Sequence, residues 1–238
     1  MRIKEGKLYR KAIAKFLNME KPELILDIAC GQGWIKKSID YSGTVHGADL
    51  YADKPEDYAY FFRQDFNKKF PEGLGKYNCI VCCEAMSYLL NPGFFLDNVY
   101  DHLEDDGFFV LSLPNPTYVG ARINQLLQGF PRSYSHFVKN TAPEPHMPWL
   151  MLGLFQLWFI MGLAGFKDII VLDVPEKKPK RFLERPLGLL MKVYYRNRIK
   201  KSKTNGERKL WEQAMSDQVI YGRNLVISAR KQQKEIGK

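Results

Sequence analysis

The stretch LILDIACGQG at residues 24–33 decides how this chain folds. Its first five residues, Leu24–Ile28, form a predominantly apolar run that predicts a strand buried on both faces. Gly31 and Gly33 then form a Gly-x-Gly turn, and residues 34–40 are predicted to be a helix. Open α/β sheets use this order to place a ligand at the carboxyl end of a strand. The glycines let the backbone approach that ligand, and helix N–H groups can bind an anionic part of it.

Two nucleotide-type cofactors fit this pattern. A dinucleotide site requires a third small residue three positions after the second glycine, and this chain has Lys36 there. Asp49 follows the predicted strand at 44–48, where a carboxylate can hold the two hydroxyls of a ribose. Both cofactors contain that ribose, so Asp49 indicates a nucleoside without choosing between them. The alternative for Asp49 is a cap on the following turn.

The residues around the glycine turn resemble the first motif of the class I S-adenosylmethionine-dependent methyltransferases, within them the broad group that acts on small molecules and glycans. That motif is an acid followed by Gly/Ala-Cys-Gly-x-Gly, and the resemblance continues in order to about residue 173. It implies an α/β fold with a Rossmann-like, doubly wound, seven-stranded sheet, mostly parallel with a reversed last strand. It also implies S-adenosylmethionine as the cofactor. The cofactor-binding residues that it implies are Asp27, Ala29, Cys30, Gly31, Gly33, Asp49, Leu50, Asp65, Phe66, Cys83 and Tyr88.

Two later stretches match further positions of the resembled family. Asp65 is implied to accept a hydrogen bond from the adenine amino group, with Phe66 packed on the ring. Without the resemblance, Asp65 reads equally well as a helix cap. After the predicted strand Tyr77–Cys83, Ser-Tyr-Leu at 87–89 stands where the family commonly has Glu-His-Leu. Tyr88 provides a hydrogen-bonding side chain at the position of the family's histidine, but unlike histidine it is not a base that titrates near neutral pH.

The long connection at residues 114–147 is expected to cover the substrate. Loops of this length in compact domains are usually functional, and this one follows a strand at the carboxyl edge of the predicted sheet. It contains His136 and His146. In the resembled group a histidine often precedes the helix before an Ala-Gly-Phe strand start, which is found here at 164–166, and His146 matches it. We therefore expect His146 and Tyr88 to be catalytic, with a surface or packing histidine as the alternative for His146.

The net charge of +10 lies in one segment. Residues 176–209 contain thirteen Lys/Arg and three Glu, whereas the rest of the chain contains 23 basic and 23 acidic residues. This segment lies within 175–217, a basic helical insertion between predicted strands six (166–174) and seven (219–229), where the resembled family has a short hairpin. Helices are predicted at 186–199 and 207–215. Their mixture of cationic, aliphatic and aromatic residues is typical of an anionic membrane surface; a solvated helix is the alternative, and a nucleic acid is the least favoured partner.

The 238 residues are expected to form a single methyltransferase domain, 1–238. The chain shows no secretory signal pattern and has four cysteines, so we expect a cytoplasmic protein that can lie at the inner face of a membrane. Three of the cysteines fall in a predicted strand without a second ligand pair, so no metal is expected. The apolar stretch 149–164 is expected to pack on the sheet, with surplus apolar surface that the insertion, a second copy in a homodimer or lipid covers.

Three functions remain open. The first is O-methylation of a small molecule, a glycan or a lipid-linked intermediate by S-adenosylmethionine. The second is a non-catalytic adaptor that binds the cofactor at a membrane surface. The third is an NAD-dependent oxidoreductase, which Lys36 and the predicted antiparallel last strand oppose.

Overall fold

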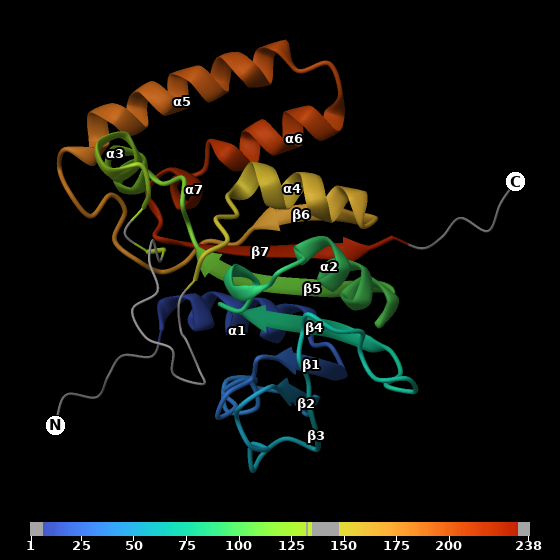
Figure 1. Cartoon of the computed structure of the whole chain (residues 1–238). Helices are drawn as coiled ribbons and strands as arrows, with labels where there is room; N and C mark the ends of the chain where they lie inside the picture. Colours follow the sequence, from blue (N-terminus) through green and yellow to red (C-terminus); the bar gives the residue numbers. More distant parts are fainter. Residues whose placement is uncertain (1–6, 132, 135–147, 233–238) are drawn as a thin grey trace, which may run out of the picture.

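The structure is a computed structural model that describes residues 7–131, 133–134 and 148–232 of the chain. One sheet of seven strands runs through the protein in the order β3-β2-β1-β4-β5-β7-β6 (Figure 1). The strands are β1 (Leu24–Ile28), β2 (Thr44–Asp49), β3 (Tyr60–Arg63), β4 (Tyr77–Cys83), β5 (Leu103–Pro114), β6 (Phe166–Val171) and β7 (Asn224–Lys231). β1 to β5 pair in parallel, whereas β7 runs antiparallel to both β5 and β6. The expected Rossmann-like sheet with a reversed last strand is confirmed.

Helices cover both faces of the sheet. They are α1 (Leu8–Glu20), α2 (Pro92–Asp101), α3 (Val119–Gln128), α4 (Leu154–Leu163), α5 (Glu184–Lys201), α6 (Asn205–Ala214), α7 (Asp217–Tyr221) and the 3-10 turn η1 (Met86–Tyr88). α1 lies behind the sheet in Figure 1, and α2 and α4 lie in front of it. Within the described residues, no helix is long and apolar enough to cross a membrane.

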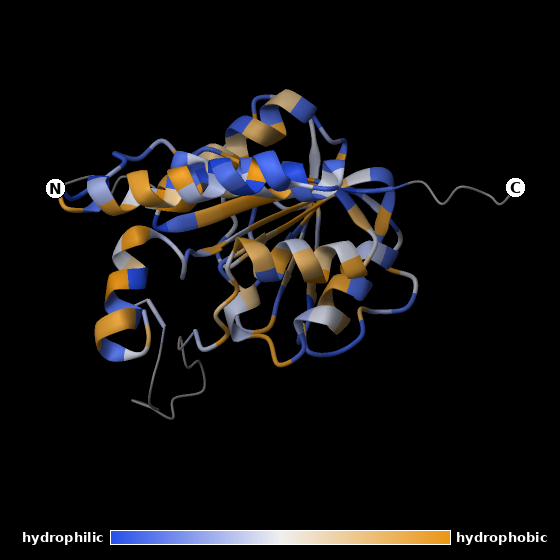
Figure 2. Ribbon diagram, turned by 90° about the horizontal axis from the view of Figure 1, so that it is seen from above, coloured by the Kyte–Doolittle hydropathy of each residue, from blue (hydrophilic) through white to orange (hydrophobic). Residues whose placement is uncertain are grey.

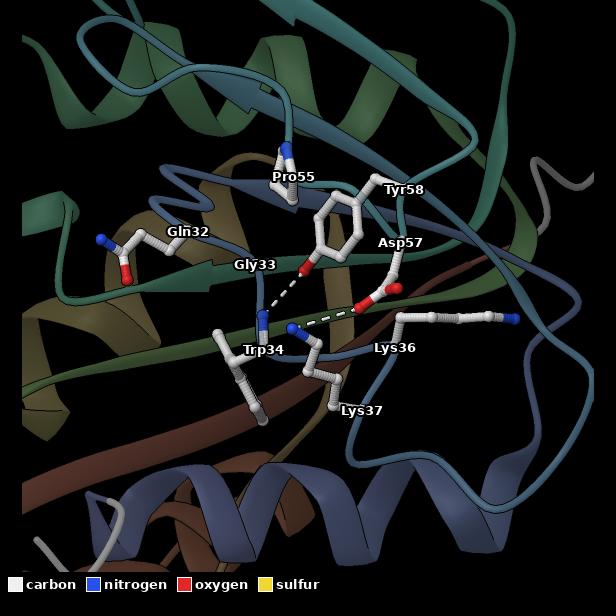
Figure 3. A pocket seen from close by; sticks show the side chains of 8 residues that line it. All are labelled: Gln32, Gly33, Trp34, Lys36, Lys37, Pro55, Asp57 and Tyr58. Atoms are coloured by element: carbon white, nitrogen blue, oxygen red, sulfur yellow. Dashed lines mark hydrogen bonds and ion pairs between the residues drawn. The ribbon is translucent and has the colours of Figure 1, made fainter.

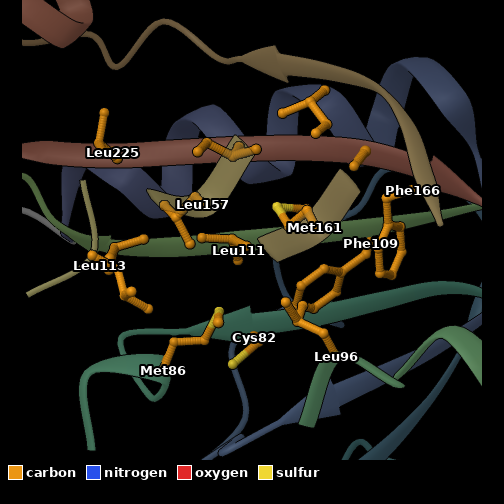
Figure 4. Close-up of a cluster of buried hydrophobic side chains, with 14 of the residues drawn as sticks. Cys82, Met86, Leu96, Phe109, Leu111, Leu113, Leu157, Met161, Phe166 and Leu225 are labelled. Carbon is orange, nitrogen blue, oxygen red and sulfur yellow. The ribbon is translucent and has the colours of Figure 1, made fainter. Parts of the chain in front are cut away.

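Two separate cores lie on the two faces, because successive side chains of a strand point to opposite sides of a sheet. In β4, Cys79 and Val81 pack with residues of α1, whereas Ile80 and Cys82 pack with residues of α2 and α4. Figure 4 shows the second core, where Met161 of α4 lies against the sheet. The cysteine-containing run is therefore a buried strand, as predicted.

The predicted helix at 34–40 is wrong, because these residues form turns instead. The backbone N–H groups of Trp34 and Ile35 donate to the hydroxyl of Tyr58 at 3.2 and 3.3 Å. The ammonium of Lys36 donates at 2.6 Å to a backbone carbonyl seven residues further on. The segment is thus held by distant side chains and by its own lysine rather than by a helical ladder, and no helix N-terminus faces the ligand here.

The last strand begins at Asn224 rather than at the predicted residue 219, because Asp217–Tyr221 form α7. The hydroxyl of Ser216 caps α7 by accepting a hydrogen bond from the N–H three residues on, at 3.4 Å. The buried side chain of Gln218 then accepts from the N–H of Val174 at 2.9 Å and donates to the carbonyl of Asn224 at 2.7 Å. These bonds hold the residues before β7 against the segment after β6.

Several other predicted elements are present with shifted ends. A strand is also predicted at residues 58–63; it is present as β3, which begins at Tyr60, and β6 ends at Val171 instead of 174. A helix is also predicted at residues 2–17; within the described residues it is present as α1, which continues through Asn18 to Glu20. α4 is shorter than the apolar stretch that predicted it, since residues 149–153 lie outside any helix.

The inserted segment folds as a helical hairpin of α5 and α6 (Figure 1). The two predicted helices are confirmed, although α5 extends further at both ends. The hairpin packs beside α4, as expected, since the rings of Phe155 and Trp211 lie 5.2 Å apart. Tyr195 of α5 joins the same cluster, at 5.8 Å from the Trp211 ring.

Candidate cofactor and acceptor site

A left-handed turn follows β1 at the carboxyl edge of the sheet. Ala29, Gly31 and Gly33 have φ values of 54°, 55° and 70°, and a positive φ at an alanine is strained. A Cβ added at Gly33 would lie 2.6 Å from the Cβ of Pro55, whereas a Cβ added at Gly31 would meet nothing within 4 Å. Gly33 is therefore required by the packing of the protein itself. Gly31 instead borders open space, where a ligand can approach the backbone.

Asp49, at the end of β2, is held beside this turn. Its Oδ2 accepts a hydrogen bond from the N–H of Gly31 at 2.9 Å. Its Oδ1 accepts from the N–H groups of Tyr51 and Ala52, each at 2.9 Å. Because a carboxylate has about four lone-pair sites, Asp49 keeps capacity for a further donor such as a ribose hydroxyl. The half-buried Leu50 follows it, so both predicted residues lie next to the glycine turn.

Asp27 is fully buried at the base of the turn. The hydroxyl of Tyr58 donates to its Oδ2 at 2.5 Å, and its Oδ1 has no hydrogen-bond partner within the described part of the chain. Burial raises the pKa of Asp27 to about 7, although the Tyr58 bond opposes this shift. One tyrosine hydroxyl thus joins the carboxylate of β1 to the backbone of residues 34 and 35. The sequence carries no signal for this role of Tyr58, which lies 31 residues from Asp27.

A shallow depression lies on the outer side of the turn (Figure 3). Its lining includes Gly33, Trp34, Pro55 and Tyr58, and the ion pair between Lys37 and Asp57 closes one side at 3.2 Å. Its empty space is about 140 Å³ with open solvent included. Ligand pockets usually measure about 300–1,000 Å³, so we do not assign the cofactor to this depression.

A second acidic residue lies at the carboxyl end of β4. Glu84 has a strained φ of 61° and follows Cys83 directly. Its Oε1 accepts hydrogen bonds from the hydroxyl of Ser112 at 3.2 Å and from the amide of Asn224 at 3.4 Å. Burial raises the pKa of Glu84, while these two hydrogen bonds lower it. Our sequence interpretation missed Glu84, although an acid directly after a buried strand beside β1 is a signal that could have found it.

Tyrosine hydroxyls gather near this carboxylate. Burial raises the pKa of Tyr9, Tyr88 and Tyr134, and the charge of Glu84 raises each of them further. The three side chains therefore remain protonated and can donate hydrogen bonds; Tyr134 already donates to the carbonyl of Pro114 at 2.8 Å. The catalytic and cofactor-binding roles of Tyr88 stay predictions. His136 and His146 lie outside the described residues.

The side chains of Asp65 and Phe66 contact other residues of the protein, whereas the resemblance implies that they contact the adenine of the cofactor. Asp65 Oδ1 accepts from the backbone and side-chain nitrogens of Asn67 at 3.0 and 3.2 Å, as a local cap would. Phe66 packs edge-to-face on Phe70 and Phe95, with only 9% of its surface exposed. Their roles toward adenine stay predictions.

The two cysteines of the predicted cofactor site are neutral thiols. Burial raises the pKa of Cys30 to about 12 and that of Cys83 well above its ordinary value. Cys30 lies two residues after the end of β1 and Cys83 is the last residue of β4, where a small side chain leaves room at the carboxyl edge. Among the residues that the structure describes, no group of three His, Cys, Asp or Glu is placed to hold a metal ion.

These features define a Rossmann-like α/β protein, with the candidate site at the carboxyl ends of β1, β2 and β4. The family described as "Methyltransferase domain" matches residues 1–154, and the chain belongs to this family. No curated protein sequence matches the chain. The cofactor is S-adenosylmethionine, as expected, and the protein is a methyltransferase of the class I type.

Solved structures agree with this fold. A S-adenosylmethionine-dependent methyltransferase from Clostridium acetobutylicum ATCC 824 superposes with a TM-score of 0.55 at 11% identity, covering 96% of this chain and 93% of its own. The plantazolicin methyltransferase BpumL in complex with SAH gives 0.54 at 16% identity, covering 95% and 83%. A S-adenosylmethionine-dependent methyltransferase from Mesorhizobium loti gives 0.52 at 16% identity, covering 94% and 100%. At such identities the likeness concerns the fold.

The residues present fit S-adenosylmethionine. The open space at Gly31 admits a ligand to the backbone, and Asp49 offers a pre-positioned acceptor for a diol. The buried Asp27 has an unpartnered oxygen within the described residues, directly below the turn. A ligand with a ribose and positively charged groups matches these three features.

Proposed function

We propose that the chain transfers the methyl group of S-adenosylmethionine to an oxygen atom of a small molecule, a glycan or a lipid-linked intermediate. The observation that carries the proposal is the presence of two acidic side chains, Asp49 and Glu84, along the same edge of the sheet. Asp49 is fixed beside open backbone at Gly31, and Glu84 is half-enclosed by hydroxyl and amide donors two strands away. The first arrangement suits a nucleoside and the second suits an acceptor that must lose a proton.

The cofactor supplies an activated methyl group on a sulfonium, so the protein needs to align the acceptor, exclude water and remove a proton. Glu84 is suited to the last task, because burial raises the pKa of its carboxyl and a base works best when its pKa approaches the working pH. Tyr88 can donate a hydrogen bond that orients the acceptor. His146 stays a second candidate for the base.

The choice of acceptor and of acceptor atom is based on the polar groups around Glu84. The carboxylate and tyrosines around Glu84 are polar groups of the kind that bind hydroxylated compounds. BpumL has been crystallised with desmethylPZN analogs and SAH, so this fold also accommodates an acceptor of that kind. The CurJ carbon methyltransferase has a similar fold at a TM-score of 0.54, covering 54% of its own chain, so the product must identify the methylated atom.

The test is an acceptor screen with the full chain and isotope-labelled S-adenosylmethionine. Sugar nucleotides, lipid-linked glycans and quinone precursors would be offered, and the position of the label would be read by NMR. Transfer to a hydroxyl oxygen supports the proposal, and transfer to carbon or nitrogen contradicts the proposed O-methylation. Tight cofactor binding without turnover on any acceptor would favour an adaptor.

Substitutions then separate the candidate bases. Glu84→Gln keeps the hydrogen-bonding shape but removes the charge, and we expect a loss of turnover of roughly 10²–10⁴-fold with unchanged cofactor affinity. His146→Ala and Tyr88→Phe are the comparisons. If His146→Ala alone abolishes turnover, the base is His146 and Glu84 has only a positioning role.

A further inference from the structure

We propose that α3, α5 and the residues just before α5 carry a docking surface for an anionic membrane. Its apolar part consists of six large side chains that point into solvent, which are Leu126, Leu127, Phe182, Leu183, Leu189 and Leu190. Leu126 is 86% exposed and Phe182 is 77% exposed, the two highest values among these residues. The proposal goes beyond methyl transfer and holds for any acceptor.

The packing of α5 explains why this side faces outward. Gly188 and Tyr195 are buried and lie seven residues apart, which is two helical turns and therefore one face of the helix. Gly188 lies against Tyr221, whose hydroxyl oxygen would be only 2.2 Å from an added Cβ. Since this face meets the body of the protein, Leu190 and Val193 lie on the opposite face and stay uncovered.

α3 extends the same surface. The guanidinium of Arg122 donates to the hydroxyl of Tyr195 at 3.1 Å and joins α3 to α5. Figures 1 and 2 both show α3 beside the N-terminal part of α5, and Figure 2 shows hydrophobic residues on each helix. α3 begins five residues after the end of β5 at Pro114, so the docking surface borders the carboxyl edge that holds the candidate site.

The charges around the docking surface fall into two groups. Lys192, Arg198, Arg208 and Lys209 form ion pairs with carboxylates of this chain at 2.6–3.6 Å. A second group is exposed and forms no ion pair within the described residues; it includes Arg181, Arg185, Arg196, Lys200 and Lys201. This second group is left to attract an anionic partner.

A lipid surface matches both parts of the docking surface. The cations can meet phosphate headgroups while the leucines and Phe182 enter the boundary with the acyl chains. A second copy of this chain would bring like charges together, because residues 176–209 carry the whole net charge of +10. α5 is also the outermost element on its side of the molecule in Figure 1, where it can lie along a flat surface.

The experiment is co-sedimentation of the full chain with vesicles. Vesicles of phosphatidylglycerol and phosphatidylcholine in equal parts are compared with phosphatidylcholine alone, at low and at high salt. We expect binding to the anionic vesicles, at least tenfold weaker without phosphatidylglycerol, and weaker at 1 M salt, where the Debye length falls to about 3 Å. Equal binding to both vesicles, or binding to neither, overturns the proposal.

Matched variants locate the surface. Leu189→Ser with Leu190→Ser, and separately Lys200→Glu with Lys201→Glu, should each weaken vesicle binding by roughly tenfold. Met19→Ser and Lys11→Glu with Lys15→Glu are the controls, because these exposed residues lie on α1 behind the sheet. Controls that lose as much as the α5 variants overturn the proposal, and so does a dimer in solution that Leu189→Ser with Leu190→Ser dissociates. Turnover on a soluble acceptor should be unchanged in all variants, which separates this test from that of the methyltransferase function.

Discussion

The glycine turn at the carboxyl edge and the α5–α6 hairpin are built on different physics. In the turn, a few side chains each make several hydrogen bonds: Asp49 accepts three backbone N–H groups, and Tyr58 joins Asp27 to two more. The hairpin carries many exposed charges in surface ion pairs, each of which is worth about 0–1 kcal/mol. We therefore expect single substitutions to abolish ligand binding at the turn. Substitutions in the hairpin should each lower the stability of the protein only a little, and these losses should add up.

The largest expected effect is on cofactor binding by Gly31→Val. The added side chain would enter the space that we assign to the ligand, and we expect the affinity for S-adenosylmethionine to fall at least 100-fold, which is about 2.7 kcal/mol. Gly73→Val is the matched control, because Gly73 also has a positive φ, of 79°, and open space around it. Calorimetry showing equal affinities for the two variants would remove the cofactor assignment.

The next effect is the pH dependence of stability that Asp27 creates. Burial raises its pKa in the folded state from 3.8 to about 7, so the folded protein holds a proton that the unfolded chain releases between these values. The free energy of unfolding should therefore fall by about 1 kcal/mol per pH unit from about pH 4 to 7 and level off above it. Asp27→Asn should lack this decline in urea unfolding measured across that range. Parallel curves for the two proteins would contradict the assignment.

A smaller loss of stability is expected for Tyr58→Phe. Removing the hydroxyl leaves the N–H groups of Trp34 and Ile35 and a carboxyl oxygen without their partner, at a cost of about 1–3 kcal/mol in the free energy of unfolding. Tyr41→Phe is the matched control, because the buried hydroxyl of Tyr41 has no partner in the described structure. We expect no loss in that variant. A comparable loss in both would mean that the bridge through Tyr58 is not the cause.

The smallest effect belongs to the hairpin. Thr204 caps α6 by accepting a hydrogen bond from the N–H of Glu207 at 3.1 Å. Thr204→Ala should lower the free energy of unfolding by about 1 kcal/mol, and Thr204→Ser should restore it. Cofactor affinity should be the same in both variants. A change of affinity would show that the hairpin and the turn are coupled, against the contrast drawn above.

Local patterns predicted most of the elements. The run at 24–28 was predicted as β1 with the bounds that the structure shows, and so was β4, because continuous apolar runs of that length fit a buried parallel strand. The predicted helix at 34–40 failed because its N–H groups bond to Tyr58, which local propensity does not reveal. Likewise, α7 replaced the start of the predicted last strand, with Ser216 as its cap.

The residues of the candidate site likewise fall into those that were predicted from the sequence and those that were missed. Gly31, Gly33 and Asp49 were predicted from motif positions, and the structure places them together, because the carboxyl ends of β1 and β2 are adjacent in a parallel sheet. Glu84 and Tyr58 were missed as site residues. Their importance depends on burial and on partners between 23 and 140 residues away in the chain.

By itself, the sequence determined the fold class, the glycine turn and the concentration of the entire +10 charge in residues 176–209, since each depends on residue type and local order. Tertiary structure alone decided which groups share the carboxyl edge and which face of α5 is left uncovered. The physical reason is that hydrogen bonds and burial join residues through space. Asn224 bonds to Glu84, which lies 140 residues away in the chain. Tyr221 packs against Gly188 on the buried face of α5, and the leucines on the other faces of this helix remain in solvent.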